Sequence, residues 1–220
     1  MKTANAVKRA KKVKILLMDV DGVLTDGKMY YIHGNNGQMT EFKAFHSLDG
    51  IGLRMLRQFG ILTGLITGRE SPGTEERAKI LRMKYAYQGF LSKVKPLEEI
   101  LADCNLSAED TAYIGDDWTD IPVMKRVKFA CAPKNALSEV KSIAHFVSSK
   151  EGGSGSVREV CEFILKSQGR WKEIMTLVET ARWDPLPKEE IKIVRHSDWE
   201  AERATEAKDA LAGKGRKIDA

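Results

Sequence analysis

The sequence has little of what would place a chain in a membrane or in an oxidising compartment. Its three cysteines, Cys104, Cys131 and Cys161, are odd in number and far apart, so they provide neither a disulfide framework nor the close pairs of a zinc site. No apolar run approaches the ~20 residues that a bilayer-spanning helix needs. The run Ile15–Met18 ends at Asp19, too early for the apolar region of a secretory signal. These absences predict a reduced, cytoplasmic protein with no membrane partner.

Acidic residues are missing from the first fourteen positions. The basic side chains there contribute +6 to the charge and are Lys2, Lys8, Arg9, Lys11, Lys12 and Lys14. Because the formal net charge of the chain is +5, residues 15–220 carry −1. The basic excess therefore belongs to a leader, residues 1–12, that we expect to be solvated. A nucleic-acid-binding domain needs a basic patch on its folded body, so we expect no nucleic-acid partner; binding through the leader is the alternative.

The remaining chain divides by composition into a body of domain size, residues 13–169, and a charged extension, residues 170–220. With 42% hydrophobic residues overall, the chain can bury a core of its own. In the extension 22 of 51 residues are charged, against 30% for the whole chain. Apolar residues at helical spacing predict one amphipathic helix there, at Trp171, Ile174, Leu177 and Val178. From Trp199 onward the sequence is typical of a solvated helix or a disordered tail.

Short apolar runs alternate with segments of helical periodicity along residues 13–169. Val13–Met18 is apolar except for Lys14 and is followed by Asp19, which is typical of a strand buried on both faces of a parallel sheet. Further strands are predicted at 61–67, 85–87, 112–115, 127–132 and 144–147. Helices are predicted at 48–59, 74–83, 95–104, 119–126, 136–142 and 157–166. This order predicts an α/β fold with a doubly wound, Rossmann-like parallel sheet. One insert interrupts it: Asn-Gly between the strand-like runs 28–33 and 38–45 predicts a β-hairpin.

Polar residues follow four of the predicted strands. They are Asp19-Val20-Asp21-Gly22, Thr67-Gly68-Arg69, Lys93 and Gly115-Asp116-Asp117 with Asp120. In open parallel sheets ligands bind beyond the carboxyl ends of the strands. Each motif alone is a common turn, cap or surface residue. Their recurrence at successive strand ends favours one shared site.

These residue types suit phosphoryl transfer. Of two aspartates held close together, one can attack phosphorus while the other moves a proton. The acid cluster requires a hard divalent cation, and oxygen ligands shared with phosphate suit Mg²⁺. Asp116 supplies a further carboxylate ligand. Lys93 and Thr67 supply a positive charge and a hydrogen-bond donor for the phosphoryl oxygens.

An ordered set of motifs extends through the body of the chain. Its members are Asp19–Gly27, Phe42–Phe45, Asp49-Gly50, Ile66–Arg69, Tyr87–Gly89, Gly115–Asp117, Pro122–Met124 and Gly152–Glu159. No single string is decisive, but the set resembles the haloacid-dehalogenase-like phosphatases. More narrowly, it resembles the 3-deoxy-D-manno-octulosonate 8-phosphate phosphatases over residues 13–169, which are the expected phosphatase domain.

The resemblance implies a role for each matching residue. Asp19 is the expected nucleophile and Asp21 the acid and base, with Mg²⁺ held by the Asp19 and Asp116 carboxylates and the Asp21 backbone carbonyl. The residues expected to bind phosphate or substrate are Thr67, Gly68, Arg69, Lys93 and Arg158. Asp120 is expected to orient Lys93 from behind, and Asp117 is a further acid without an assigned role.

The spacing of the motifs leaves no room for a cap domain. Asp19 and Thr67 are 48 residues apart, and Lys93 and Asp116 are 23 apart. An open rim would expose the reaction to water, where fixed charges lose much of their value. The hairpin or a neighbouring subunit must therefore close the site. The resemblance implies a homotetramer whose hairpins pack together and whose glycine-rich segment, Gly152–Gly155, reaches an adjacent active site; a flexible linker is the alternative for those glycines.

Two positions bear on the substrate, which we expect to be a small phosphorylated sugar acid. Family members often carry Arg where this chain has Leu48, and a missing charge weakens the case for carboxylate recognition. Arg69 favours the octulosonate 8-phosphate, because the nonulosonate 9-phosphate phosphatases resemble a version with Glu there. A nonulosonate 9-phosphate or another sugar phosphate is the first alternative, and a non-catalytic binding or regulatory module on the same fold is the second.

Overall fold

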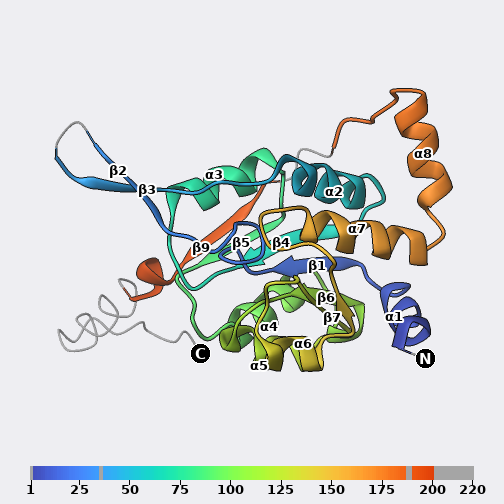
Figure 1. Ribbon diagram of the computed structural model, residues 1–220, viewed down its shortest axis with the longest axis horizontal. Coiled ribbons are helices and arrows are strands. Elements are labelled where there is room, and N and C mark those ends of the chain that lie inside the picture. Colours follow the sequence, from blue (N-terminus) through green and yellow to red (C-terminus); the bar gives the residue numbers. More distant parts are fainter. Residues whose placement is uncertain (1, 35–36, 187–189, 201–220) are drawn as a thin grey trace, which may run out of the picture.

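A seven-stranded parallel sheet forms the centre of the molecule (Figure 1). The computed structural model describes residues 2–34, 37–186 and 190–200. Across the sheet the strand order is β8-β7-β6-β1-β4-β5-β9, and every neighbouring pair is parallel. The strands are β1 (Ile15–Met18), β4 (Leu62–Ile66), β5 (Tyr85–Gln88), β6 (Thr111–Ile114), β7 (Phe129–Ala132), β8 (Phe146–Val147) and β9 (Lys192–Arg195). The first six agree with the predicted strands, which confirms the doubly wound sheet.

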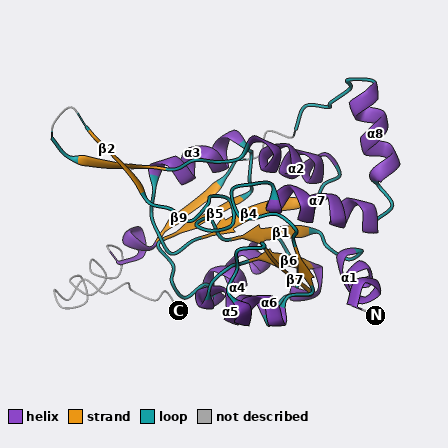
Figure 2. Ribbon diagram, in the orientation of Figure 1, coloured by secondary structure: helices purple, strands orange, loops and turns teal. Residues whose placement is uncertain are grey.

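The central strands are apolar because helices cover both of their faces. In β1, Leu16 and Met18 belong to one apolar cluster and Ile15 and Leu17 to the other. The first face carries α2 (Ser47–Gln58), α3 (Pro72–Ile80) and α7 (Ser156–Ser167). The second carries α4 (Val94–Asp103), α5 (Ile121–Met124) and α6 (Ser138–Ile143) (Figure 2). A strand covered on both sides has no polar face, so it reads as an unbroken apolar run.

One predicted helix divides into two short elements. Instead of a helix over 119–126, the chain forms a 3₁₀ turn, η2 (Trp118–Asp120), followed by the four-residue α5. The side chains of Asp117 and Asp120 cap η2 reciprocally, and Pro122 stands in the first turn of α5, where a missing backbone donor costs nothing. A second 3₁₀ turn, η1 (Ala108–Asp110), precedes β6.

The hairpin insert projects away from the sheet (Figure 1). It consists of β2 (Tyr30–His33) and β3 (Met39–Phe42), paired antiparallel with Tyr30 opposite Phe42. The two asparagines of its tip lie outside the described residues. Between β1 and β4 the described chain holds only this hairpin and α2, and between β5 and β6 only α4 and η1. There is accordingly no cap domain in the described part of the molecule.

The basic leader is more than a solvated arm. Residues 2–10 form α1 (Lys2–Ala10), whose small side chains Ala6 and Ala10 are buried with Val13 in the core cluster that includes α7. Gln168 Nε2 donates hydrogen bonds to the carbonyls of Ala10 (3.2 Å) and Val13 (2.9 Å). Lys8 is still exposed to solvent. The expectation of a solvated leader was therefore wrong for the helix itself, because alanines at helical spacing provide a narrow apolar face.

The charged extension contributes a helix and a strand. The predicted amphipathic helix is α8 (Trp171–Glu179), with Ile174 buried. The strand β9, which the sequence did not predict, pairs with β5 and is the last strand in the order across the sheet. Residues 196–200 after it are helical, and most of the tail expected from Trp199 onward, residues 201–220, lies outside the described residues. No helix in the described ranges combines the length and the apolar character that crossing a membrane requires.

Candidate active site

Four adjacent strands deliver the predicted side chains to one edge of the sheet. Asp19 follows β1, Thr67 follows β4, Lys93 lies beyond β5 and Asp116 lies beyond β6. In the sheet these strands stand in the order β6-β1-β4-β5. Because all are parallel, their carboxyl ends meet at the same edge. Asp19, Thr67 and Lys93 are buried there, and Asp116 is half-buried.

Lys93 is buried between two carboxylates. Its Nζ lies 2.8 Å from Asp19 Oδ2 and 2.7 Å from Asp120 Oδ1, and only 2% of the residue is exposed. Burial alone would lower the pKa of Lys93, but the charges of Asp19 and Asp120 outweigh it and raise that pKa. The ammonium group therefore stays charged at the bottom of the site.

Asp120 is fully engaged by neighbouring donors. Its Oδ1 also accepts the hydroxyl of Tyr113 (2.7 Å), and its Oδ2 accepts the backbone N–H groups of Asp116 (3.0 Å) and Asp117 (3.2 Å). A Cβ on Gly115 would lie 2.4 Å from the Asp120 Cβ, so only glycine allows this close approach. Asp120 thus holds Lys93 and the 116–117 loop in place, which is the contact that the resemblance implied.

The donor set at this edge fits a hard divalent cation. One carboxylate oxygen each from Asp19, Asp116 and Asp120 lies within 4.8 Å of the others. Burial raises the pKa of Asp116 to about 8, with a contribution from Asp19, and burial raises the pKa of Asp19 to about 6 despite Lys93. Asp116 Oδ1 is buried without a hydrogen-bond partner among the described residues. Since the oxygens of Asp120 are already occupied, Asp19 and Asp116 are the side chains that fit Mg²⁺, with the Asp21 carbonyl as the expected third ligand.

Gly22 leaves space for the Asp116 carboxylate. Its φ is +87°, in the region that favours glycine, and a Cβ added there would lie 2.1 Å from Asp116 Oδ2. The turn after β1 and the loop after β6 therefore touch only because position 22 carries no side chain.

We expect Gly22→Ala to displace the Asp116 carboxylate and weaken Mg²⁺ binding roughly 10- to 100-fold, as loss of a supporting contact does at metal sites. Titration calorimetry with Mg²⁺ measures this directly. Gly60→Ala is the matched control, because Gly60 also has a positive φ (+72°) but nothing lies within 4 Å of its added Cβ. Equal Mg²⁺ affinity in the two variants would contradict the placement of Asp116 in the site.

Lys43 from the hairpin contacts Asp21. Its Nζ donates to Asp21 Oδ1 and lies 3.4 Å from Glu41 Oε1, while Glu41 also pairs with Arg69. The side chain of Lys43 is only 3% exposed. A row of alternating charges thus runs from Asp21 across the base of the hairpin to the loop after β4. The sequence patterns did not identify Lys43 and Glu41 as site residues, although the Phe42–Phe45 motif marked the segment.

The loops after β4 and β5, which carry Thr67 and Lys93, are joined by backbone hydrogen bonds. Thr67 N donates to the Tyr87 carbonyl (2.9 Å), and Phe90 N donates to the Thr67 carbonyl (2.9 Å). A Cβ on Gly68 would lie 2.9 Å from a methyl carbon of Leu91, so the two loops also approach each other through a side chain. The segments that carry Thr67 and Lys93 are consequently linked to each other as well as to the sheet.

The glycine-rich segment packs on other parts of its own chain. Gly152 N donates to Asn135 Oδ1 (2.7 Å), and Asn135 Nδ2 donates to the Gly22 carbonyl (3.0 Å). A Cβ on Gly152 would lie 1.8 Å from that carbonyl oxygen. The alternative of a flexible linker was therefore wrong, because Gly152 lets the backbone of this segment lie directly against the backbone at Gly22. That the segment also reaches an adjacent active site stays a prediction.

Two further predicted residues make contacts outside the carboxylate cluster. Arg158 N, in the first turn of α7, donates to Asp49 Oδ1 of α2 (2.8 Å), and Arg158 Nε pairs with Glu162 within α7 (2.8 Å). Its contact with substrate stays a prediction. Asp117 is exposed, and its Oδ1 accepts the N–H of Trp118 (2.6 Å), so it caps η2 and stands outside the carboxylate cluster.

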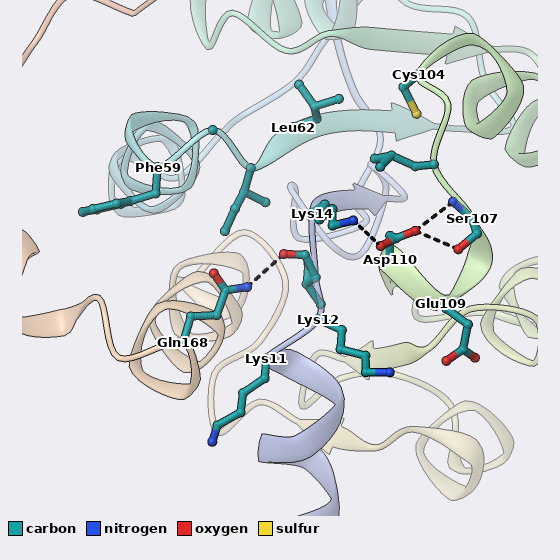
Figure 3. Close-up of a pocket in the computed structure, with 14 residues that line it drawn as sticks. Lys11, Lys12, Lys14, Phe59, Leu62, Cys104, Ser107, Glu109, Asp110 and Gln168 are labelled. Atoms are coloured by element: carbon teal, nitrogen blue, oxygen red, sulfur yellow. Dashed lines mark hydrogen bonds and ion pairs between the residues drawn. The ribbon is translucent and has the colours of Figure 1, made fainter.

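A hollow lies at the opposite end of the strands from the carboxylate cluster. This cavity of ≈ 700 Å³ is lined by residues at the amino ends of the strands, among them Lys14, Leu62 and Asp110 (Figure 3). Lys14 and Asp110 pair across it at 2.9 Å. Its size does not make it the active site, because the aspartates and Lys93 all lie at the carboxyl ends.

Fold and site together define an aspartate-based phosphatase of the haloacid dehalogenase class, and a family model described as haloacid dehalogenase-like hydrolase matches residues 86–159. The 3-deoxy-D-manno-octulosonate 8-phosphate phosphatase of Yersinia pestis is 40% identical over 166 residues, which are 76% of this chain and 87% of that protein. The chain therefore belongs to the family of 3-deoxy-D-manno-octulosonate 8-phosphate phosphatases.

Two solved structures support the assignment. The Moraxella catarrhalis 3-deoxy-D-manno-octulosonate 8-phosphate phosphatase, solved in complex with a magnesium ion, a phosphate ion and a KDO molecule, has a TM-score of 0.74 and is 36% identical; the match covers 79% of this chain and 97% of that one. A Legionella pneumophila hydrolase described as subfamily III A of the HAD superfamily has a TM-score of 0.75 and is 33% identical, covering 81% and 96%.

Proposed function

We propose that this chain is a Mg²⁺-dependent phosphatase that hydrolyses 3-deoxy-D-manno-octulosonate 8-phosphate through an aspartyl-phosphate, as a step in the synthesis of lipopolysaccharide precursors. One observation carries the proposal: Lys93 is buried against Asp19, and the neighbouring Asp116 carboxylate has an oxygen without a hydrogen-bond partner in the described part of the chain. The magnesium, phosphate and sugar acid bound by the Moraxella relative support it. An ion pair with a purely structural role would not need a neighbouring buried carboxylate oxygen that lacks a hydrogen-bond partner.

The first half of the reaction forms a bond to the chain. Asp19 attacks the phosphorus atom, the bond from phosphorus to the sugar oxygen breaks, and Asp21 gives its proton to that oxygen. Lys93 and Thr67 stabilise the charge on the phosphoryl oxygens. Asp19, Asp116 and the Asp21 carbonyl would hold Mg²⁺, which would neutralise charge so that the carboxylate can approach phosphate.

The second half releases phosphate. Asp21, now ionised, takes a proton from a water molecule that attacks phosphorus, and the bond from phosphorus to Asp19 breaks. Lys43 lies against the Asp21 carboxylate and holds it at the base of the hairpin. Atoms balance over the cycle, since one water is consumed and Asp19 and Asp21 return to their starting states.

The substrate is tested by phosphate release from octulosonate 8-phosphate and a nonulosonate 9-phosphate, side by side, with Mg²⁺ and with a chelator. We expect chelator-sensitive preference for the eight-carbon sugar, because Arg69 stands at the rim, paired to Glu41. Activity on an aryl phosphate alone would agree with the mechanism but contradict the proposed substrate. Leu48, which is exposed on α2, would then be the first position to examine for substrate recognition. No phosphatase activity at all would favour the alternative of a binding or regulatory module.

The same proposal includes a homotetramer in which a neighbouring subunit closes the site. The support is the projecting hairpin, which exposes large apolar side chains that water disfavours: Tyr31, Ile32, Met39 and Phe42. Without a cap domain in the described chain, closure must come from another subunit or from the hairpin itself. A fully active monomer at micromolar concentration in sedimentation velocity would contradict this part.

We also propose a cytoplasmic location. All three cysteines are unpaired, and Cys131 and Cys161 are buried as free thiols, the state that a reducing compartment maintains. Fractionation of the source cells tests this, and recovery with periplasmic or secreted protein would contradict it.

A further inference from the structure

The C-terminal extension reaches the rim of the active site. Strand β9 pairs in parallel with β5, with Arg195 opposite Gln88, so the carboxyl ends of both strands lie at the same edge. The helical residues 196–200 therefore emerge beside the loops that carry Thr67 and Lys93 (Figure 1). This segment lies beyond Glu159, where the last family motif ends.

One contact joins the extension to the loop after β4. Ser197 donates twice to Glu70, from its backbone N to Oε1 (2.8 Å) and from its Oγ to Oε2 (2.7 Å). Glu70 is three residues after Thr67. Hydrogen bonds to a carboxylate are stronger than neutral ones, and an acid at the start of a helical turn is favoured. The pair consequently fixes the end of the 67–70 loop.

A second contact joins the extension to the loop after β5. The rings of His196 and Trp199 pack edge-on against Phe90, with centroids 5.2 and 4.9 Å away, and the Lys95 ammonium lies 4.2 Å above the Trp199 ring. Phe90 is 4% exposed, although it stands in a loop. It precedes Lys93 by three residues. The aromatic cluster therefore anchors the 89–93 loop from the outer side.

We infer that residues 196–200 are a positioning element, which holds the phosphate-binding loops 67–70 and 89–93 at the spacing that phosphate requires. The inference rests on the proposed function, because that function makes phosphate the ligand of those loops. The hydrogen bond from Phe90 N to the Thr67 carbonyl joins the loops on the side of the sheet. Ser197 and Trp199 contact them on the outer side, at the Glu70 carboxylate and the Phe90 ring. A small displacement of a binding group costs much of its effect, so contacts on both sides matter.

Calorimetric titration of inorganic phosphate in the presence of Mg²⁺ tests the inference without requiring turnover. We expect Trp199→Ala and the double variant Ser197→Ala/Trp199→Ala to bind phosphate roughly three- to tenfold more weakly, the loss expected for an aromatic contact and a hydrogen bond. The KM for an aryl phosphate should rise in parallel, with a smaller change in kcat. Trp199→Phe should restore binding, because it keeps a ring against Phe90. Ser197→Ala alone is the milder variant if the others fold poorly.

Trp183→Ala is the matched control. Trp183 belongs to the same extension and packs on the core, with the Arg54 guanidinium 5.9 Å from its ring, and it has no described contact with either loop. The variant should lower Tm and leave phosphate affinity unchanged. Phosphate affinity of the double variant within about twofold of the wild-type value, less than one lost hydrogen bond costs, would overturn the inference.

The same titration separates the inference from the proposed function. A wild-type chain that binds phosphate but leaves octulosonate 8-phosphate intact would contradict the proposed substrate alone, while the variants still decide the inference. A wild-type chain that binds no phosphate with Mg²⁺ would overturn both.

Discussion

Asp19→Asn should abolish turnover, with a loss on the order of 10³-fold or more, as expected for removal of a nucleophile. The amide has the same shape and can still accept the hydrogen bond that Val20 N now gives to Oδ1 (2.7 Å). It cannot form the aspartyl-phosphate. Because Lys93 keeps Asp120 as a buried partner, the folded state should lose less stability than in a Lys93 variant, which would leave both carboxylates without a cation.

Phosphate release with Mg²⁺ measures this first prediction, and acid-quenched enzyme analysed by mass spectrometry adds a direct readout. The wild-type peptide that contains Asp19 should carry a phosphoryl group, and the variant peptide should not. Asp184→Asn, an exposed position in the extension, is the control and should retain full activity. Retained activity in Asp19→Asn would refute the mechanism.

Lys93→Met should lower both activity and stability. Methionine nearly fills the space, but it leaves Asp19 and Asp120 buried without their shared cation. Removal of one partner from a buried ion pair costs about 3–5 kcal/mol. Loss of a charged donor at the phosphoryl group should reduce turnover roughly 10²- to 10³-fold. Phosphate release measures the first effect, and chemical denaturation in the presence of a chelator measures the second.

The stability loss in Lys93→Met should depend on pH. Burial raises the pKa of Asp19 to about 6 from an ordinary 3.8, so the folded chain binds a proton that the unfolded chain releases between these values. This group therefore favours folding at low pH and ceases to do so as the pH rises through about 6. Without Lys93 the pKa rises further, so the deficit relative to wild type should be larger at pH 8 than at pH 5. Lys166→Met, which breaks a surface pair with Glu162 and a surface cation–π contact with Trp171, should cost about 1 kcal/mol at either pH.

The sheet and the main site residues were predictable from sequence because their signals are local. Strand β1 is apolar throughout and stops at Asp19, and the ends of parallel strands must share an edge. That rule alone places Asp19, Thr67, Lys93 and Asp116 together. Their individual roles were taken from the resemblance, and the geometry of Lys93 and Asp120 agrees with what it implied.

Other features depend on contacts between segments far apart in the chain. Strand β9 has four residues in a highly charged segment, and its pairing with β5 leaves no periodic signal in the sequence. Lys43 reaches Asp21 only because the hairpin returns over the turn after β1. A glycine-rich run such as the one at Gly152 is also typical of a linker, and only the fold shows that its missing side chain lets it lie on the Gly22 carbonyl.

The sequence by itself therefore determined the family, the parallel sheet and the acids and lysine at its edge, since strand periodicity and motif order are properties of neighbouring residues. Only the tertiary structure decided which side chains hold those groups: Tyr113 on Asp120, Lys43 on Asp21, and Ser197 and Trp199 on the loops after β4 and β5. The reason is physical. A hydrogen bond or an aromatic contact between residues over 100 positions apart, such as Glu70 and Ser197, exists only when the whole chain has folded.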